Sequence, residues 1–271
     1  MKKSRQKSKF LSGFYLVLVY TFLFIPIVAV VVGSVNSNSY NTSFDGFTLD
    51  WYAKMLSNSS LLEGLGNTII LAVASTILSI VIGTLAAFGM YRFKFKGKGL
   101  LDTMFYIPIV IPEIVLGISL MVLFSMLDMS TGMLTLIIAH TTFCIPYVVF
   151  NVRASIAGFD PALEEASMDL GRNRIQTFFR ITLPLIMPGI TSGAFMAFTL
   201  SIDDVIISYF TSGPSSQTLP IVVYNMTRKK LTPDVYALST IIILVVLIGS
   251  IGSQVNFKKL FAKYKRSKIE Q

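Results

Sequence analysis

Residues Thr68–Met90 read TIILAVASTILSIVIGTLAAFGM, a stretch without a single charged side chain. A helix needs about 20 apolar residues to cross the hydrocarbon core of a bilayer, so this stretch predicts a transmembrane helix. Five more stretches are apolar enough to be read the same way, approximately Phe14–Val35, Leu101–Leu127, Met133–Val149, Pro188–Phe210 and Val235–Val255. Met133–Val149 is the shortest of them. The sequence therefore predicts an all-α, polytopic membrane protein with six transmembrane helices.

The composition excludes most other classes of protein. Of 271 residues, 53% are hydrophobic and only 14% are charged, whereas a soluble domain carries about 25% charged residues. The same high hydrophobic and low charged fractions exclude a disordered protein. A disulfide scaffold is excluded because there is only one cysteine. The apolar stretch from Phe10 to Val35 is too long for a signal peptide, so no cleavable signal is expected.

The positions of the 23 basic residues predict the orientation of the bundle. Lys and Arg favour cytoplasmic loops, and here they concentrate in residues 2–9, 92–98, 153–180 and 258–268. This pattern predicts cytoplasmic tails at residues 1–13 and 257–271, flanking one transmembrane domain of residues 14–256. Lys54 and residues 228–230 are the exceptions. The net charge of +9 is then explained by topology and by attraction to lipid headgroups, and nucleic-acid binding is not expected.

Residues that could perform catalysis are scarce. Gly97-Lys98-Gly99 lacks the spacing and the hydroxyl of a phosphate-binding loop. His140 is the only histidine, and in a membrane span we interpret it as a packed, hydrogen-bonded residue. We therefore expect no catalytic residue and no metal site, and any energy source must belong to another subunit.

A polar segment of residues 151–187 separates spans four and five. Asp160-Pro161 is typical of a helix start, and Glu164 and Glu165 in the first turn suit the positive end of the helix dipole. Gly171 then predicts a sharp turn before a second helix from about Asn173 to Thr182. Two short amphipathic helices on the cytoplasmic side, within residues 158–184, are either a surface hairpin or a docking element for a partner.

The residues of this loop resemble those of a known family. Glu165-Ala166-Ser167-x3-Gly171-x9-Ile181-x-Leu183-Pro184 is similar to the EAA loop of permease subunits in binding-protein-dependent ABC importers, with Ser167 in place of the second alanine. The resemblance implies the type I importer permease fold, with the loop seated in a cleft of an ATPase subunit. It implies that Glu165 contacts the ATPase and that Gly171 sets the angle between the helices. The coupling residues would be Glu164, Glu165, Ala166, Ser167, Gly171, Ile181, Leu183 and Pro184.

Weaker similarities concern the cargo. Phe47–Tyr52, Gly66–Thr68, Ser201–Asp204, Thr211–Pro214 and Pro233-Asp234 look like segments of the spermidine/putrescine permease group. The resemblance implies a second permease subunit (PotB-like), an ATPase dimer (PotA-like) that binds ATP and Mg, and an external polyamine-binding protein (PotD-like). No cofactor is expected on this chain itself.

Three carboxylates fall within predicted spans, where ionisable side chains usually have a function. Glu113 follows Pro108 and Pro112, which predict a bend in span three. In span five Asp204 falls in the middle of a stripe of small residues and should point into the protein, whereas Asp203 lies about 100° round the helix. The predicted substrate path consists of Glu113, Asp203, Asp204, Tyr106 and Tyr209.

Acidic side chains on such a path favour a cation, and the tyrosines could add cation–π contacts to an alkylammonium group. The residues alone leave open an organic or a metal cation, and each tyrosine could instead be an interfacial residue. The acids could also be helix caps. A membrane scaffold without transport is a further alternative. An intramembrane hydrolase is disfavoured because Asp203 and Asp204 point apart.

Overall fold

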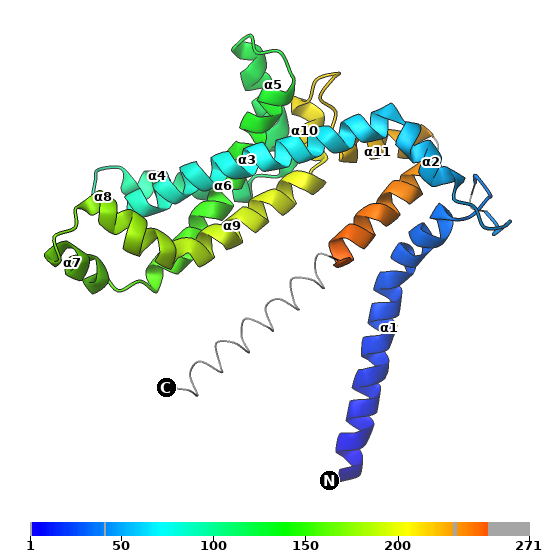
Figure 1. Ribbon diagram of the computed structural model, residues 1–271, viewed down its shortest axis with the longest axis horizontal. Helices are drawn as coiled ribbons and strands as arrows, with labels where there is room; N and C mark the ends of the chain where they lie inside the picture. The colour runs from blue at the N-terminus through cyan, green and yellow to red at the C-terminus, as the bar shows by residue number, and fades with distance from the viewer. Residues whose placement is uncertain (1, 41, 230–231, 249–271) are drawn as a thin grey trace. The chain divides into compact units, whose positions relative to one another are not determined.

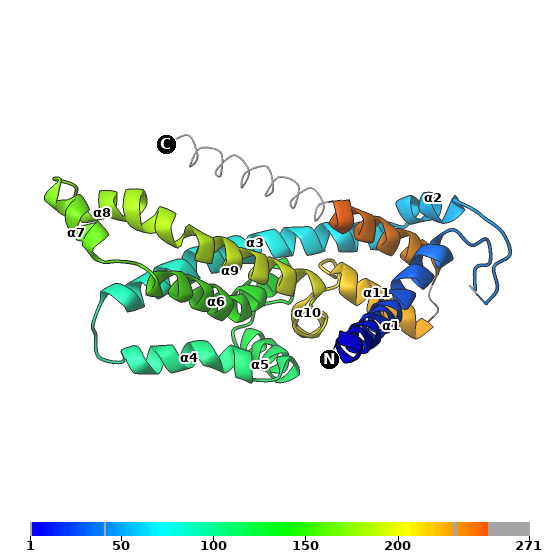
Figure 2. The same ribbon diagram turned by 90° about the horizontal axis from the view of Figure 1, so that it is seen from below.

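A computed structural model describes residues 2–40, 42–229 and 232–248, and most of them are helical (Figures 1 and 2). The only β interaction given for these residues is an isolated bridge between Asn36 and Phe47. The predicted all-α class is confirmed. The chain divides into two compact units, Met1–Ser59 with Met226–Gln271, and Ser60–Asn225.

The first unit contains α1 (Lys2–Ser34), α2 (Asp50–Ser57) and a helix over Pro233–Ile248. Hydrogen bonds tie its segments together. Ser34 Oγ lies 2.9 Å from the Tyr52 hydroxyl, and Trp51 Nε1 donates to the carbonyl of Asn36 over 2.6 Å. Asn58 Nδ2 donates to Asp234 over 2.7 Å. Polar contacts therefore hold α2 between the end of α1 and the start of the last helix.

The second unit is built on three long helices, α3 (Ser59–Arg92), α6 (Met133–Ala157) and α9 (Leu183–Asp203), which lie side by side in both views (Figures 1 and 2). Shorter elements complete it: α4 (Lys98–Val110), α5 (Glu113–Met126), α7 (Ala162–Asp169), α8 (Arg174–Thr177), the π-helical turn η1 (Phe178–Thr182), α10 (Ile206–Thr211) and the first part of α11 (Leu219–Lys229). The short fourth span is longer than predicted, because α6 continues past Val149 to Ala157.

Span three is two helices rather than one bent helix. α4 and α5 meet at 111° with a break at Ile111-Pro112. Pro112 has no backbone N–H to donate, and its carbonyl accepts from Val115 and Leu116 at 2.9 and 3.1 Å. The predicted bend is confirmed, but it is sharp enough to separate the two halves. Arg153 of α6 forms an ion pair with Asp102 and so links α6 to α4.

Span five also differs from its prediction at both ends. The helix runs without interruption over Arg174–Asp203, so the predicted boundary near Thr182 is wrong. Pro184 does not end the helix because the turn before it is π-helical, with Leu183 N–H bonded to the Phe178 carbonyl five residues back. At its other end α9 stops at Asp203, and α10 starts only at Ile206. The predicted continuous span Pro188–Phe210 is therefore broken at Asp204-Val205.

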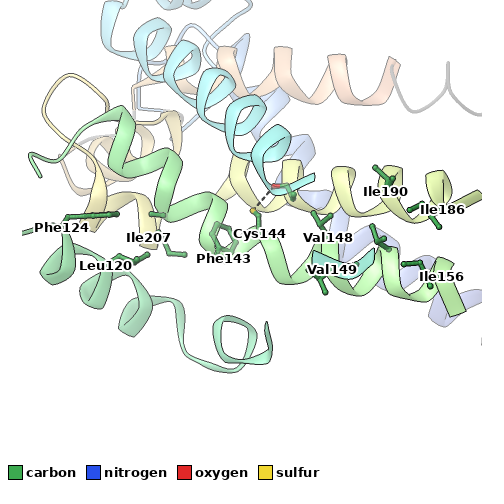
Figure 3. Packing of buried hydrophobic residues seen from close by; sticks show 14 residues of the cluster. Leu120, Phe124, Phe143, Cys144, Val148, Val149, Ile156, Ile186, Ile190 and Ile207 are labelled. Atoms are coloured by element: carbon green, nitrogen blue, oxygen red, sulfur yellow. Dashed lines mark hydrogen bonds between the residues drawn. The ribbon is translucent and has the colours of Figure 1, made fainter. Parts of the chain in front are cut away.

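Small residues allow α9 to lie against α6. Gly189, Gly193, Ala197 and Ser201 form the stripe of small residues in this span, and all four are buried, as side chains that let two helices approach closely usually are. Cys144 of α6 reaches the Ala197 carbonyl, Sγ to O 3.5 Å. Around this contact the apolar core collects side chains from α5, α6, α9 and α10 (Figure 3).

Four helices are long and apolar enough to cross a membrane, and a fifth span is formed if α4 and α5 count as one. The last helix is described only as far as Ile248. Residues 249–255 of the predicted sixth span lie outside the described residues, as does the predicted boundary at residue 257. The count of six spans stays a prediction.

Replacing Gly189 by alanine should destabilise the second unit. An alanine Cβ there would lie 2.5 Å from the Asn151 carbonyl oxygen and from Ser155 Oγ, so α9 would have to move away from α6. We expect Gly189→Ala to cost about 1–3 kcal/mol, as overpacking usually does. A lowered Tm of the purified protein in detergent would measure this.

Gly89→Ala is the matched control, because it adds the same methyl group inside α3 where nothing lies within 4 Å. Its Tm should stay unchanged or rise slightly. Equal Tm values for the two variants would contradict the close packing of α6 and α9.

Candidate functional site

The polar loop between α6 and α9 starts and stops its first helix as the sequence predicts. The Asp160 carboxylate accepts from the Ala162 N–H over 3.0 Å at the start of α7. After the helix, Gly171 has φ +84°, a left-handed conformation that glycine adopts without strain. Asn173 then caps α8, with its Oδ1 accepting from Gln176 N–H over 2.8 Å. The turn at Gly171 is confirmed.

α7 has an inward face made of polar side chains. Glu164 is 5% exposed, and its two carboxylate oxygens have separate partners. Oε2 forms an ion pair with Arg92 Nη1 at 3.0 Å, and Oε1 accepts from Thr182 Oγ1 over 2.6 Å. Ser167, one turn along, lies 3.1 Å from Thr177 Oγ1. Two residues predicted for coupling, Glu164 and Ser167, thus face the helices of their own chain.

The remaining coupling residues are more exposed. Glu165, Ala166, Gly171 and Pro184 are exposed, Ile181 is half-buried, and the half-buried Leu183 packs against the apolar core. Two large apolar side chains within five residues of Glu165 are also exposed, Leu163 at 47% and Leu170 at 84%. Ile175 and Phe179 are exposed as well, but they line a pocket between the loop and α3. We define Glu165, Leu163 and Leu170 as the outward surface of the loop. Exposed apolar side chains of this kind are typical of a contact surface for another protein.

The three predicted membrane carboxylates come from two breaks in helices. Glu113 is the first residue of α5, directly after the break at Pro112, and Asp203 and Asp204 flank the end of α9. Glu113 lies within electrostatic range of both aspartates. Asp204 is buried, which confirms the predicted inward direction, whereas Asp203 and Glu113 are exposed. The fold therefore brings the three acids into one neighbourhood.

His140 of α6 is the centre of a buried polar network beside these acids. Its side chain is fully buried, with Nδ1 at 2.8 Å from Ser201 Oγ and Nε2 at 2.9 Å from Ser208 Oγ. Nε2 also lies 3.4 Å from Asp204 Oδ2. Ser201 continues to Ser75 of α3 over 3.1 Å. The interpretation of His140 as a packed, hydrogen-bonded residue is confirmed.

The Asp204 carboxylate also holds the start of α10. It accepts from the backbone N–H groups of Ile207 and Ser208 at 3.2 and 2.7 Å. These donors are among those that a new helix leaves without partners. Asp204 is thus both a helix cap and a partner of His140.

The two tyrosines of the predicted path are half-exposed and rest on aromatic neighbours. The Tyr106 ring lies 4.7 Å from Phe150, and the Tyr209 ring lies 5.6 Å from Phe210. Within the described residues, no three His, Cys, Asp or Glu side chains come close enough to hold a metal ion.

Sequence reasoning missed the linking roles of Ser208, Ser75 and Arg92. Arg92 was explained by its place in a basic loop. Ser208 lies one turn after Asp204, but neither Ser208 nor Ser75 carries a signal of its own. Only the register between helices, which a single sequence does not contain, brings them to His140 and Glu164.

A bundle of apolar helices with acids at helix breaks and a polar loop between two long helices is typical of a helical membrane transport subunit. The chain belongs to the family of binding-protein-dependent transport system inner membrane components, whose family model matches residues 79–260. This confirms the predicted family. Members of this family are transport subunits rather than enzymes, as the sequence predicted.

Three of the relatives are named for the substrates that they transport. The chain is 38% identical to the "spermidine/putrescine transport system permease protein PotC" of Escherichia coli (strain K12), over 91% of this chain and 93% of that protein. It is 37% identical to the "putrescine transport system permease protein PotI" of the same strain, over 88% of this chain and 85% of that protein. A PotC of Haemophilus influenzae is 36% identical, over 92% of this chain and 97% of that protein.

Solved structures share the fold. A chain of a bacterial ABC transporter for the import of the acidic polysaccharide alginate matches with a TM-score of 0.74 at 14% identity, over 94% of this chain and 97% of that chain. A chain of the MetNI methionine ABC transporter matches with a TM-score of 0.59 at 20% identity, over 72% of this chain and 94% of that chain. The predicted importer permease fold is confirmed.

His140→Phe should destabilise the protein. The buried side chains of Ser201, Ser208 and Asp204 each lose the polar contact that a His140 ring nitrogen makes with them. The expected loss is about 1–3 kcal/mol, the usual cost of buried polar groups that lose a partner, because Asp204 keeps its two backbone donors. Thermal unfolding in detergent measures it. Thr142→Val, which removes a local hydroxyl bond to Ile138 from the same helix, is the control and should leave Tm within about 2 °C. Equal stability of the two variants would show that the network contributes nothing.

Proposed function

We propose that this chain is a permease subunit of an ATP-driven importer that moves spermidine or putrescine into the cytoplasm by alternating access. Relatives with these substrates in their names match over about nine tenths of the chain. The observation that supports a cationic cargo is the group of three acids, Glu113, Asp203 and Asp204, near one another at two helix breaks.

These acids differ in what they could do for a cargo. Glu113 and Asp203 are exposed and could attract ammonium groups, while Asp204 is occupied by His140 and by backbone donors. The half-exposed Tyr106 and Tyr209 could add cation–π contacts. Carboxylates in a membrane path repel phosphate and sulfate, so an anionic cargo is disfavoured.

The source of energy is proposed to be a separate ATPase dimer that binds ATP and Mg. The outward surface of the loop, Glu165 with Leu163 and Leu170, would seat in a groove of that partner. This uses the common mode in which a short helix places apolar side chains into a groove of another protein.

We propose the orientation in the membrane and the remaining partners on the same grounds, the positions of the basic residues and the resemblance to polyamine permeases. Basic residues at residues 2–9 and 258–268 support cytoplasmic termini, with residues 14–256 as the membrane domain. A second permease subunit would complete the path. An external polyamine-binding protein would deliver cargo to the outer loops at about residues 36–66 and 211–234.

Labelled spermidine should accumulate in proteoliposomes that contain the complete transporter, with the loaded binding protein outside and ATP inside. Asp203→Asn should reduce this uptake about tenfold, because an exposed carboxylate that attracts a cation contributes about 1–2 kcal/mol. The assembled complex should keep its yield, since Asp203 is not part of the buried network.

Asp128→Asn, which neutralises an exposed acid in the turn after α5 and outside the proposed delivery loops, serves as the control and should transport normally. Uptake of arginine, thiamine or ferric ion in place of spermidine would overturn the substrate but keep the class of transporter. Full spermidine uptake by Asp203→Asn would remove Asp203 from the path.

Glu165→Lys should uncouple the transporter, because it reverses a charge at the centre of the proposed ATPase contact. We expect normal insertion in the membrane, loss of most ATP hydrolysis stimulated by the loaded binding protein, and uptake lowered by about tenfold or more. Lys94→Glu, a charge reversal at an exposed residue between α3 and α4 and outside the loop, is the control. Normal coupling in Glu165→Lys would exclude the proposed docking of Glu165.

A further inference from the structure

The loop that contains α7, α8 and η1 meets the cytoplasmic end of α3 through two contacts. One is the ion pair between Arg92, the last residue of α3, and Glu164 of α7. The other is between rings, with Phe88 of α3 and Phe178 of η1 at 4.8 Å between centroids. These two contacts come from opposite ends of the loop.

Between the two contacts α3 and the loop are separated by a cavity of about 370 Å³. Its walls are mostly apolar, with Leu85 and Phe93 on the α3 side and Met168 and Ile175 on the loop side, and both contacts line it as well. This space interrupts the packing between the loop and α3. The ion pair and the ring contact are therefore the two direct links through which we expect a movement of the loop to reach α3.

Glu164 connects more than α7 and α3. Its second carboxylate oxygen is bonded to Thr182, directly before α9, and Ser167 on the same face bonds Thr177 of α8. The Glu164 side chain is 6% exposed and that of Arg92 is 33% exposed, so the pair is partly shielded from water. A charge-assisted bond in such a place has a fixed geometry and resists displacement.

We propose that Arg92 and Glu164 are positioning residues for coupling: they join the loop to α3 and α9 so that all three move together when the ATPase displaces the loop. This rests on the proposed function of the loop. It assigns Glu164 a role different from that of Glu165. Glu165 contacts the partner, whereas Glu164 passes the movement to two transmembrane helices of its own chain.

The test uses the complete transporter in proteoliposomes and compares Glu164→Gln, Arg92→Gln and the exchange Arg92→Glu with Glu164→Arg. Glutamine keeps the size of Glu164 and can still accept from Thr182, but it removes the ion pair. Each single variant should retain the ATPase on purification and lower the spermidine imported per ATP hydrolysed about tenfold, within the usual range of coupling between sites. The exchange should restore at least half of the lost ratio.

Lys94→Gln is the matched control, because it removes one exposed positive charge two residues from Arg92; its ratio should equal that of the unaltered complex. An unchanged ratio in both single variants, or loss of the bound ATPase from either, would overturn the proposal. A failure of the proposed substrate is distinguished beforehand, because the unaltered complex would then not import spermidine at all.

Discussion

Backbone N–H and C=O groups inside a bilayer have no water to bond, and this constraint decides where the helices of this chain can stop. At the end of α9 the Asp204 carboxylate takes the place of water by accepting from Ile207 and Ser208 N–H groups. At the end of α4 the chain uses Pro112, which has no N–H to satisfy and whose carbonyl accepts from the first turn of α5. Asp204 and Pro112 thus make the two breaks possible, because each leaves fewer backbone groups without a hydrogen-bond partner.

The same breaks create the conditions for moving a charged cargo. In an unbroken helix all backbone groups are hydrogen-bonded to one another, so none is available to an acid. An acidic side chain facing lipid without such a partner costs free energy. Asp204 is the most buried of the three acids at the helix breaks. It is paired with His140 and two backbone donors, so its charge stabilises the fold. Glu113 and Asp203 remain exposed beside it. We infer that the buried acid shapes the path and that the two exposed ones meet the cargo.

How far the sequence predicts this structure depends on the range of the interactions involved. Apolar length found the helices that are long enough to cross a membrane, and a periodicity of 3.6 residues was enough to turn Asp204 inward, while it left the direction of Asp203 open. The sequence did not predict that Pro112 separates two helices while Pro184 lies inside one, because prolines are tolerated in membrane helices when neighbouring groups compensate. That compensation, the π-helical turn at Phe178–Thr182, depends on packing. The hydrogen-bond partners of His140 lie at least 61 residues away, in or next to α9 and α10. Glu164 pairs with Arg92 of α3, and only its other partner, Thr182, is near in the sequence.

The division of α7 into two faces explains why its internal contacts are polar. A helix of eight residues is too short to be stable alone, so it needs both caps and partners. If the inward face of α7 were also apolar, either face could pack against the neighbouring helices. The helix could then rotate about its own axis. Hydrogen bonds and an ion pair avoid this ambiguity, because they are directional and are satisfied only in one orientation. The polar contacts on the inward face of α7 and the apolar side chains on its outward face therefore give this short helix one fixed orientation.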